Sequence, residues 1–254
     1  MNISVDVVLS QSEPLTYEAD IWLVIDILRA TSVISRWFEL GGKIIYPVIE
    51  PEDALKLAEK LKAQGETPLL MGERHAVLID GFNLGNSPLD LKPEIINKYS
   101  CAVMSTTNGT AALNTAFKNN KPVISVCARN AKAAVKYALN YLNKNNEFKI
   151  GILCSGRHKR TAWDDTLCAG LLIEILKDIC GDNLEIADCA RLSLELWQNH
   201  KHEFYNSIMT AEHAKFLDNL GFGRDIKFAC EIDSAQVAPV LYYNESLDSI
   251  YLKN

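Results

Sequence analysis

Four segments of the chain place polar side chains directly after apolar runs that read as buried strands. They are VIDILRATSVI (24–34), GERHAVLIDGFNLGNSP (72–88), TTNGTAAL (106–113) and CSGRHKRTAWDDTLCAG (154–170). In open α/β sheets, ligands collect at the carboxyl ends of the strands. The carboxylates, guanidinium groups and hydroxyls of these segments suit an anion such as phosphate, so we expect them to form one site.

The first segment brings Asp26 to the end of a strand, and Arg29, Thr31 and Ser32 follow it. Thr31 or Ser32 can cap the next helix. A helix N-terminus offers free N–H groups and the positive end of the helix dipole, which suits phosphate. An Asp–Arg pair that only stabilises a loop explains the same residues. The Asp-x-Asp pattern of haloacid-dehalogenase phosphatases is absent, because position 28 is Leu.

In the second segment, Glu73 and Arg74 stand just past a strand, and Asn86 and Ser87 precede a proline as a cap or turn would. The glycines of this segment indicate a loop whose backbone lies close to another group, and ordinary turns explain them equally well.

The third segment contains an Asn108-Gly109 turn and then the start of a helix. Asn-Gly permits a tight turn, and the hydroxyls of Thr106, Thr107 and Thr110 are near in sequence. The segment resembles a phosphate cradle in type, although it is not a Walker loop. An Asn-Gly turn alone does not distinguish an anion site from an ordinary turn.

The fourth segment joins the most basic run of the chain, Arg157–Arg160, to Asp164 and Asp165 at the start of a helix. Acids at that position are ordinary helix caps. They are equally suited to Mg²⁺, which prefers oxygen ligands and often uses one or two carboxylates together with waters and phosphate.

Cys154 and Arg160 offer a different mechanism, because they have the C-x₅-R spacing of cysteine-dependent phosphatases, in which a thiolate attacks phosphorus. However, the glycine between them is at the second position instead of the third, and Leu153 replaces the usual preceding His. With seven cysteines in the chain, such a spacing arises easily by chance, so we expect metal-dependent chemistry instead.

Composition narrows the class of protein. The chain has 254 residues, of which 48% are hydrophobic and 23% charged, enough for a sizeable core. A net charge of −6 argues against a nucleic-acid partner, which needs an excess of Lys and Arg. No apolar run approaches the roughly 18–20 residues that cross a bilayer, and the N-terminus has no signal-peptide pattern. We therefore expect no membrane partner and a cytoplasmic location.

The cysteines form no CxxC pair, which favours reduced thiols over a zinc site.

The elements that must position these segments alternate between strand and helix patterns, which predicts an α/β fold with a mainly parallel sheet and flanking helices. The predicted strands are Ile3–Leu9, Ile21–Asp26, Lys43–Val48, Pro68–Met71, Cys101–Ser105, Val123–Val126, Lys149–Cys154, Ile226–Cys230, Val240–Tyr243 and Ile250–Leu252. The predicted helices are Pro51–Gln64, Asn130–Asn143, Asp165–Cys180, Asp188–Asn199 and Thr210–Leu220. We expect one unit over residues 1–254, with a boundary near residues 125–135 if it divides into two α/β lobes.

Together, IDILRATS, GER with GFNLGNSP, TTNGT and DDTLCAG resemble the 2-phosphosulfolactate phosphatase family of coenzyme M biosynthesis. A fifth piece, EHAKFLDNLGFGRDIKFACEID, resembles the C-terminal region of that family and includes His213, Asp225 and Asp233. The resemblance covers nearly the whole chain. It implies a family-specific α/β fold with the active site between α/β portions. It also implies Mg²⁺ as cofactor and hydrolysis of a small anionic phosphate ester, (2R)-O-phospho-3-sulfolactate, to (2R)-3-sulfolactate and phosphate.

On this basis we expect Asp26, Arg29, Arg74 and Asp165 to be catalytic. Mg²⁺ is expected on Asp26 and Asp165, with Asp164 or Glu73 in support. The two arginines are expected to clamp phosphate, because Arg makes bidentate contacts. His213 either protonates the leaving oxygen or is a structural surface residue. Hydrogen bonds to the substrate are expected from Thr31, Ser32, Asn86, Ser87, Thr107, Asn108, Gly109 and Thr110.

Three departures from the family pattern leave alternatives open. His75-Ala76 replaces a glycine-rich pair, Asn83 stands where Asp is common, and Ala214 stands where Gly is common. If the Asp usual at position 83 were a metal ligand, Asn83 would weaken the metal site. The alternatives are a phosphatase for a related phospho-hydroxyacid, such as phospholactate or phosphoglycerate, and a non-catalytic anion-binding module. The sequence also leaves a homo-oligomer open.

Overall fold

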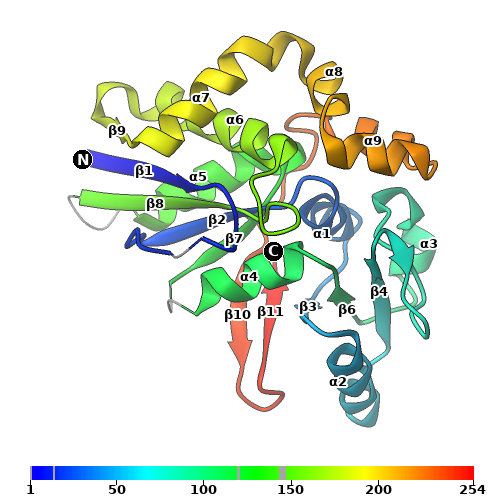
Figure 1. Cartoon of the computed structure of the whole chain (residues 1–254). Helices are drawn as coiled ribbons and strands as arrows, with labels where there is room; N and C mark the ends of the chain where they lie inside the picture. The colour runs from blue at the N-terminus through cyan, green and yellow to red at the C-terminus, as the bar shows by residue number, and fades with distance from the viewer. Residues whose placement is uncertain (1, 14, 119–120, 143–146) are drawn as a thin grey trace.

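The strands of the protein form one large sheet with helices on both faces (Figure 1). The computed structural model describes residues 2–13, 15–118, 121–142 and 147–254. Within them the sheet has 11 strands in the order β5-β4-β6-β3-β11-β10-β7-β2-β8-β1-β9. This confirms the α/β fold expected from the sequence.

In the larger group of parallel strands, β2 lies between β8 and β7. Side chains of β2 alternate between two core clusters, with Leu23 on one face of the sheet and Trp22 and Val24 on the other. A strand that is apolar on both faces is typical of a parallel sheet covered by helices. In spatial order the group is β9 (Leu184–Ile186), β1 (Asn2–Val8), β8 (Glu147–Cys154), β2 (Ile21–Ile25) and β7 (Val123–Val126).

The smaller parallel group consists of β3 (Ile45–Pro47), β6 (Cys101–Ser105) and β4 (Pro68–Arg74), with β5 (Val77–Leu78) antiparallel at its edge. The hairpin β10 (Val240–Asn244) and β11 (Ser249–Lys253) joins the two groups, through single antiparallel pairs to β7 and β3. Three antiparallel steps therefore make the two groups run in opposite senses. A twist of about 20–25° at each of the five steps from β2 to β6 adds up to roughly 100–125°. The two groups therefore do not point in opposite directions, and the carboxyl ends of both reach the cavity described below.

Helices cover both faces of the larger group. The first core cluster joins that group to α5 (Ala131–Leu142), α6 (Trp163–Cys180) and α7 (Asp188–His200), and the second joins it to α1 (Ala30–Glu39) and α4 (Gly109–Phe117). A third cluster packs α2 (Pro51–Ala63) on the smaller group. The remaining helices are α3 (Pro93–Ile96), α8 (Phe204–Met209), α9 (Glu212–Asn219), α10 (Gly223–Ala229) and the 3₁₀ helices η1 (Pro88–Asp90), η2 (Ala128–Asn130), η3 (Gly181–Asn183) and η4 (Lys201–Glu203).

One predicted strand is wrong. The segment Ile226–Cys230 lies largely in helix α10 and forms no strand. Its apolar residues alternate in sequence, which mimics a strand. The buried residues Asp225, Ile226, Phe228 and Ala229 instead follow helical spacing, because α10 packs against α9 and α8. The expected boundary near residues 125–135 stays a prediction.

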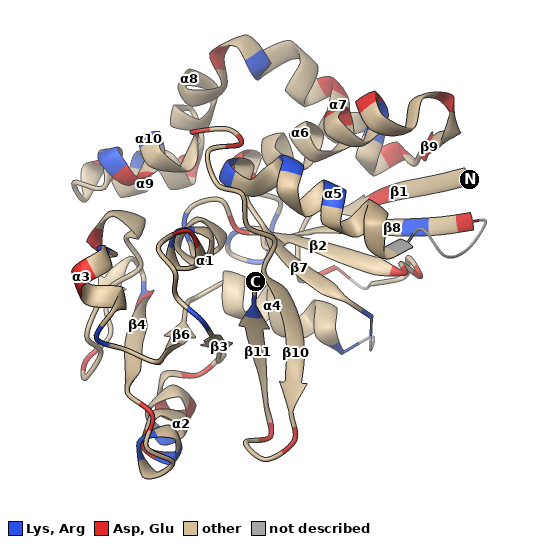
Figure 2. Cartoon of the chain, turned by 180° about the vertical axis from the view of Figure 1, so that it is seen from behind, with Lys and Arg blue, Asp and Glu red and all other residues tan. Residues whose placement is uncertain are grey.

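The surface carries charges of both signs. Figure 2 shows acidic and basic positions together on α2, seen from behind. In the part of the chain that the structure describes, no helix combines the length and apolar character needed to cross a bilayer.

Candidate active site

The loop after β2 folds around Asp26. Oδ1 of Asp26 accepts a hydrogen bond from the Ala30 backbone N–H at 3.1 Å. The Thr31 hydroxyl donates to the Asp26 carbonyl at 2.8 Å, and the Ser32 hydroxyl donates to the Ile27 carbonyl at 2.8 Å. Both hydroxyls are buried and hold the loop in shape, whereas Asp26 reaches the cavity described below.

Glu73, at the end of β4, ties two neighbouring loops together. Its Oε1 accepts from the Thr107 N–H at 2.9 Å, and its Oε2 accepts from the Ala76 N–H at 2.7 Å. The next residue, Arg74, points elsewhere. Its Nη2 donates to the Ile49 carbonyl at 2.5 Å and to the Ser105 hydroxyl at 3.0 Å.

The N-terminus of α4 lies very close to the side chain of Asp26. At Gly109, a Cβ atom would lie 2.4 Å from the Ala30 Cβ and 2.8 Å from Oδ2 of Asp26. Thr110 closes the preceding turn, since its hydroxyl donates to the Thr106 carbonyl at 2.9 Å. Only glycine allows the backbone after β6 to approach the Asp26 carboxylate so closely.

The two acids at the start of α6 have different surroundings. Oδ1 of Asp165 accepts from the Ile27 N–H at 3.0 Å, and Oδ2 accepts from the Ser155 hydroxyl at 2.9 Å and the Gly156 N–H at 3.0 Å. Asp165 therefore joins the loops after β2 and β8. Oδ2 of Asp164 lies 3.6 Å from Nδ1 of His213, and its buried Oδ1 has no hydrogen-bond partner among the described residues.

A cavity of about 250 Å³ lies where these loops meet. It is lined from the carboxyl ends of four strands, by Asp26 after β2, Glu73 on β4, Asn108 after β6 and Arg157 after β8. The convergence of the strand-end loops at one cavity agrees with the expectation from the sequence. The other lining residues are Leu28, Arg29, His75, Ala76, Asn86, Thr107, His158, His213, Phe216 and Leu217.

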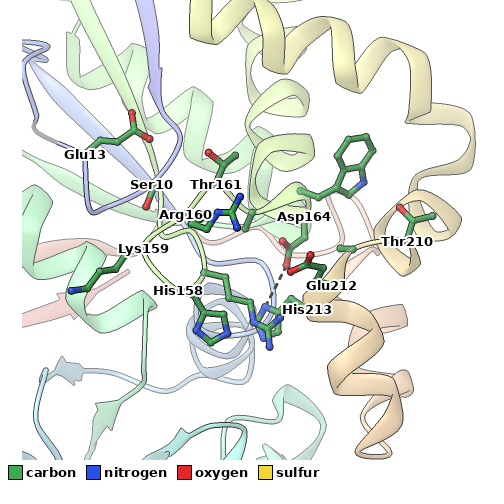
Figure 3. Close-up of a pocket in the computed structure, with 14 residues that line it drawn as sticks. Ser10, Glu13, His158, Lys159, Arg160, Thr161, Asp164, Thr210, Glu212 and His213 are labelled. Atoms are coloured by element: carbon green, nitrogen blue, oxygen red, sulfur yellow. Dashed lines mark ion pairs between the residues drawn. The ribbon is translucent and has the colours of Figure 1, made fainter.

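A wider cavity of about 740 Å³ adjoins the first and shares Arg157, His158 and His213 with it. Its wall includes Asp164 and the turn Arg157–Arg160, whose end residues exchange backbone hydrogen bonds at 2.9 Å. Figure 3 shows the Asp164 carboxylate next to the His213 ring on the wall of this cavity, with their ion pair as a dashed line. Among the described residues, none of the three cations on the turn is in an ion pair with an acid.

Burial and mutual repulsion disfavour the ionised forms of the carboxylates Asp26 and Asp165. Burial raises the pKa of Asp26 from 3.8 to about 6, a rise that the neighbouring His213 partly offsets. Burial also raises the pKa of Asp165 well above its ordinary value, and repulsion from Asp164 and Asp26 adds to this rise. A bound cation would relieve this repulsion.

The side chains that remain available suit a hard cation. The described residues contain no group of three or more His, Cys, Asp or Glu arranged to hold a metal. Mg²⁺ commonly uses only one or two carboxylates. Asp164 offers an unpartnered buried oxygen, and Oδ2 of Asp26 is outside the hydrogen bond to Ala30. Both oxygens of Asp165 and of Glu73 are engaged, so these two residues fit a metal less well.

The predicted residues thus fall into two sets, and their roles stay predictions. Those that line one of the two cavities are Asp26, Arg29, Glu73, Asn86, Thr107, Asn108 and Asp164. Those that lie outside the linings are Thr31, Ser32, Arg74, Ser87, Gly109, Thr110 and Asp165. Phe216 and Leu217 were missed, because apolar residues on a helix give no signal of a site. Arg157 belongs to the basic run, which could have identified it.

Two of the departures from the family pattern, His75-Ala76 and Asn83, have different structural settings. His75 and Ala76 form the β4–β5 turn, with φ of 53° and 61°, where glycine is unstrained. Asn83 is away from the cavity, and its Oδ1 accepts from the Leu70 N–H at 2.9 Å. Asn83 therefore does not remove a ligand from the cavity.

The thiolate alternative has little support, because Cys154 is fully buried and burial raises its pKa well above its ordinary value of 9.0. We expect iodoacetamide at pH 7.5 to leave phosphate release by the folded protein unchanged. Mass spectrometry should find Cys154 unmodified until urea unfolds the chain. Loss of activity that follows alkylation of Cys154 would restore the thiolate mechanism.

Comparison with known proteins identifies the family of this chain. The sequence model described as 2-phosphosulpholactate phosphatase matches residues 8–244. A Clostridium perfringens (strain 13) protein named "probable 2-phosphosulfolactate phosphatase" is 40% identical over 231 residues, which is 89% of this chain and 88% of the relative. A protein of the same name from Caldanaerobacter subterraneus subsp. tengcongensis is 35% identical over 219 residues, or 86% of each chain. The chain therefore belongs to the 2-phosphosulfolactate phosphatase family, a family of phosphoric monoester hydrolases.

Proposed function

We propose that the chain is a Mg²⁺-dependent phosphatase that hydrolyses (2R)-O-phospho-3-sulfolactate to (2R)-3-sulfolactate and phosphate. The observation that carries this proposal is the cavity into which the ends of β2, β4, β6 and β8 bring a buried carboxylate, an amide and guanidinium groups. Hydrolysis of a phosphate monoester depends chiefly on positioning and on neutralising the charge of the phosphoryl oxygens.

We assign the metal to Asp26 and Asp164, which have the free carboxylate oxygens. When bound, Mg²⁺ would neutralise phosphoryl charge and lower the pKa of a coordinated water. Asp165 and Glu73 hold the loops that carry these ligands, through bonds to backbone N–H groups.

The chain's other residues bind and orient the ester. Arg29, Arg157 and the Asn86 amide line the cavity and bind the phosphoryl oxygens. His213 lies beside Asp164, which orients its ring, and delivers a proton to the leaving oxygen. The turn Arg157–Arg160 borders the wider cavity, where its cations would face the carboxylate and sulfonate of the substrate.

Phosphate release from phosphosulfolactate tests this function. We expect turnover that EDTA abolishes and Mg²⁺ restores. In a thermal melt, Mg²⁺ should raise the Tm of the wild type but not that of Asp164→Asn, because the variant lacks one carboxylate ligand. Turnover that is unaffected by EDTA would contradict the metal assignment.

Phospholactate and phosphoglycerate serve as comparison substrates. A higher kcat/KM for either one would overturn the proposed substrate while leaving the phosphatase in place. Tight binding of phosphosulfolactate without phosphate release would show instead a non-catalytic anion-binding module.

A further inference from the structure

Arg29, which lines the smaller cavity, is held in place by residues from the C-terminal part of the chain. Nη1 of Arg29 donates to Oδ2 of Asp225 on α10 at 2.6 Å, and the two side chains are only 2% and 3% exposed. Phe222 covers the guanidinium group, with Cζ of Arg29 4.1 Å from the centre of its ring. A buried cation without a partner is costly, so these contacts keep Arg29 in one position.

Asp225 is itself anchored to a cavity loop. Its Oδ1 accepts from the Ser87 hydroxyl at 2.8 Å, and Ser87 follows Asn86, which lines the cavity. Neither Asp225 nor Ser87 is in the cavity wall. Any effect of Asp225 on a ligand must therefore pass through Arg29 or through the loop that carries Asn86.

The same arrangement occurs a second time in the molecule. Arg129 packs on Phe228, with Cζ 3.6 Å from the ring centre, and pairs with Glu231 three residues later. Phe228 and Glu231 thus repeat the spacing of Phe222 and Asp225. Arg129 lines neither of the two cavities, so its pair offers an internal control.

The two arginines differ in what they leave free. Arg129 uses both terminal nitrogens on acids, since Nη1 pairs with Glu231 and Nη2 pairs with Glu39 at 3.0 Å. For Arg29, the described residues provide an acceptor to Nη1 alone. A guanidinium group carries five N–H donors in a planar fork, so Asp225 fixes one edge and leaves the other donors for a ligand.

We propose that Asp225 and Phe222 are positioning residues, which hold the free edge of Arg29 toward the phosphoryl group of the substrate. This inference rests on the proposed function for its substrate. The same geometry presents Arg29 to any phosphate that binds in the cavity.

The test compares Asp225→Asn with Glu231→Gln, after thermal melts show that both are folded. The readouts are kcat and KM for phosphosulfolactate and the Kd of inorganic phosphate by calorimetry. We expect Asp225→Asn to raise KM and the phosphate Kd about 10-fold, the effect of losing a charged hydrogen bond. Glu231→Gln should change both by less than about twofold, because its partner Arg129 lines neither cavity.

A double variant built on Arg29→Ala distinguishes a positioning role of Asp225 from a general structural role. In Arg29→Ala, adding Asp225→Asn should weaken phosphate binding no further, because no guanidinium remains to be positioned. An equal loss with and without Arg29, or unchanged binding in folded Asp225→Asn, would overturn the proposal.

If Asp225→Asn does not fold, Phe222→Leu replaces it, with Phe228→Leu as its control. We expect Phe222→Leu alone to weaken phosphate binding about 3-fold, because it removes only the cation–π contact. Equal effects of the two substitutions would overturn the proposal. A wild type that binds phosphate through Arg29 and Asp225 yet does not hydrolyse phosphosulfolactate would refute the proposed function alone.

Discussion

Replacing Asp26 with Asn is expected to abolish phosphate release and, in the metal-free protein, to raise the Tm at neutral pH. Asp26 is 6% exposed, and burial raises the pKa of its carboxyl group from 3.8 to about 6. The ionised form that we assign to metal binding is therefore the form that destabilises the fold. The Asn oxygen can still accept the hydrogen bond from Ala30, so the loop should keep its shape.

The sign of the pH dependence follows from the raised pKa of Asp26. The folded state holds this proton more tightly than the unfolded chain, so its stabilising effect is full below pH 3.8 and is lost as pH rises through about 6. Above that pH, the ionised carboxylate lowers the free energy of unfolding by up to about 3 kcal/mol. Asp26→Asn removes this cost, which corresponds to a rise in Tm of up to about 10 °C.

Thermal melts in EDTA at pH 4 and pH 7.5 measure this effect. The gain from Asp26→Asn should be present at pH 7.5 and nearly absent at pH 4. Asp182→Asn makes the same chemical change at an exposed position in η3 and should leave both melts unchanged. A variant that melts below the wild type at pH 7.5, or that still releases phosphate, contradicts the role given to Asp26.

The strand-end positions of the site were predictable from the sequence, whereas the directions of several side chains were not. Runs such as IWLVI mark buried strands, so the position of Asp26 follows from pattern alone. Asp164 and Asp165 are neighbours on a helix and project about 100° apart. Which one faces a cavity depends on how α6 packs on the sheet, and the sequence pattern does not contain this information.

Long-range contacts explain what else the sequence could not show. Arg29 and Asp225 are 196 residues apart and meet only because α10 folds back over the loop after β2. The two parallel groups face a common region only because the β10–β11 hairpin joins them and twist accumulates across it. Arg74 reads as a phosphate ligand in the sequence, but its guanidinium group binds the Ile49 carbonyl and Ser105.

Gly109→Ala is expected to reduce kcat/KM on the order of 100-fold, because it displaces the Asp26 carboxylate. Helix propensity alone predicts the opposite direction for stability, since Ala is better than Gly in a helix by about 1 kcal/mol. At this position, however, the new Cβ would lie 2.4 Å from the Ala30 Cβ and 2.8 Å from Oδ2 of Asp26. Overpacking of this kind costs about 1–3 kcal/mol, so we expect a net loss of stability as well.

Gly85→Ala is the matched control for this substitution. A Cβ at Gly85 meets no atom within 4 Å, and the backbone there does not adopt the left-handed conformation that strains other residues. Phosphate release and thermal melts of both variants separate contact with Asp26 from the general loss of a glycine. If Gly109→Ala keeps wild-type kcat/KM, then α4 does not constrain the carboxylate, and the close approach of the loops after β2 and β6 is not what organises the site.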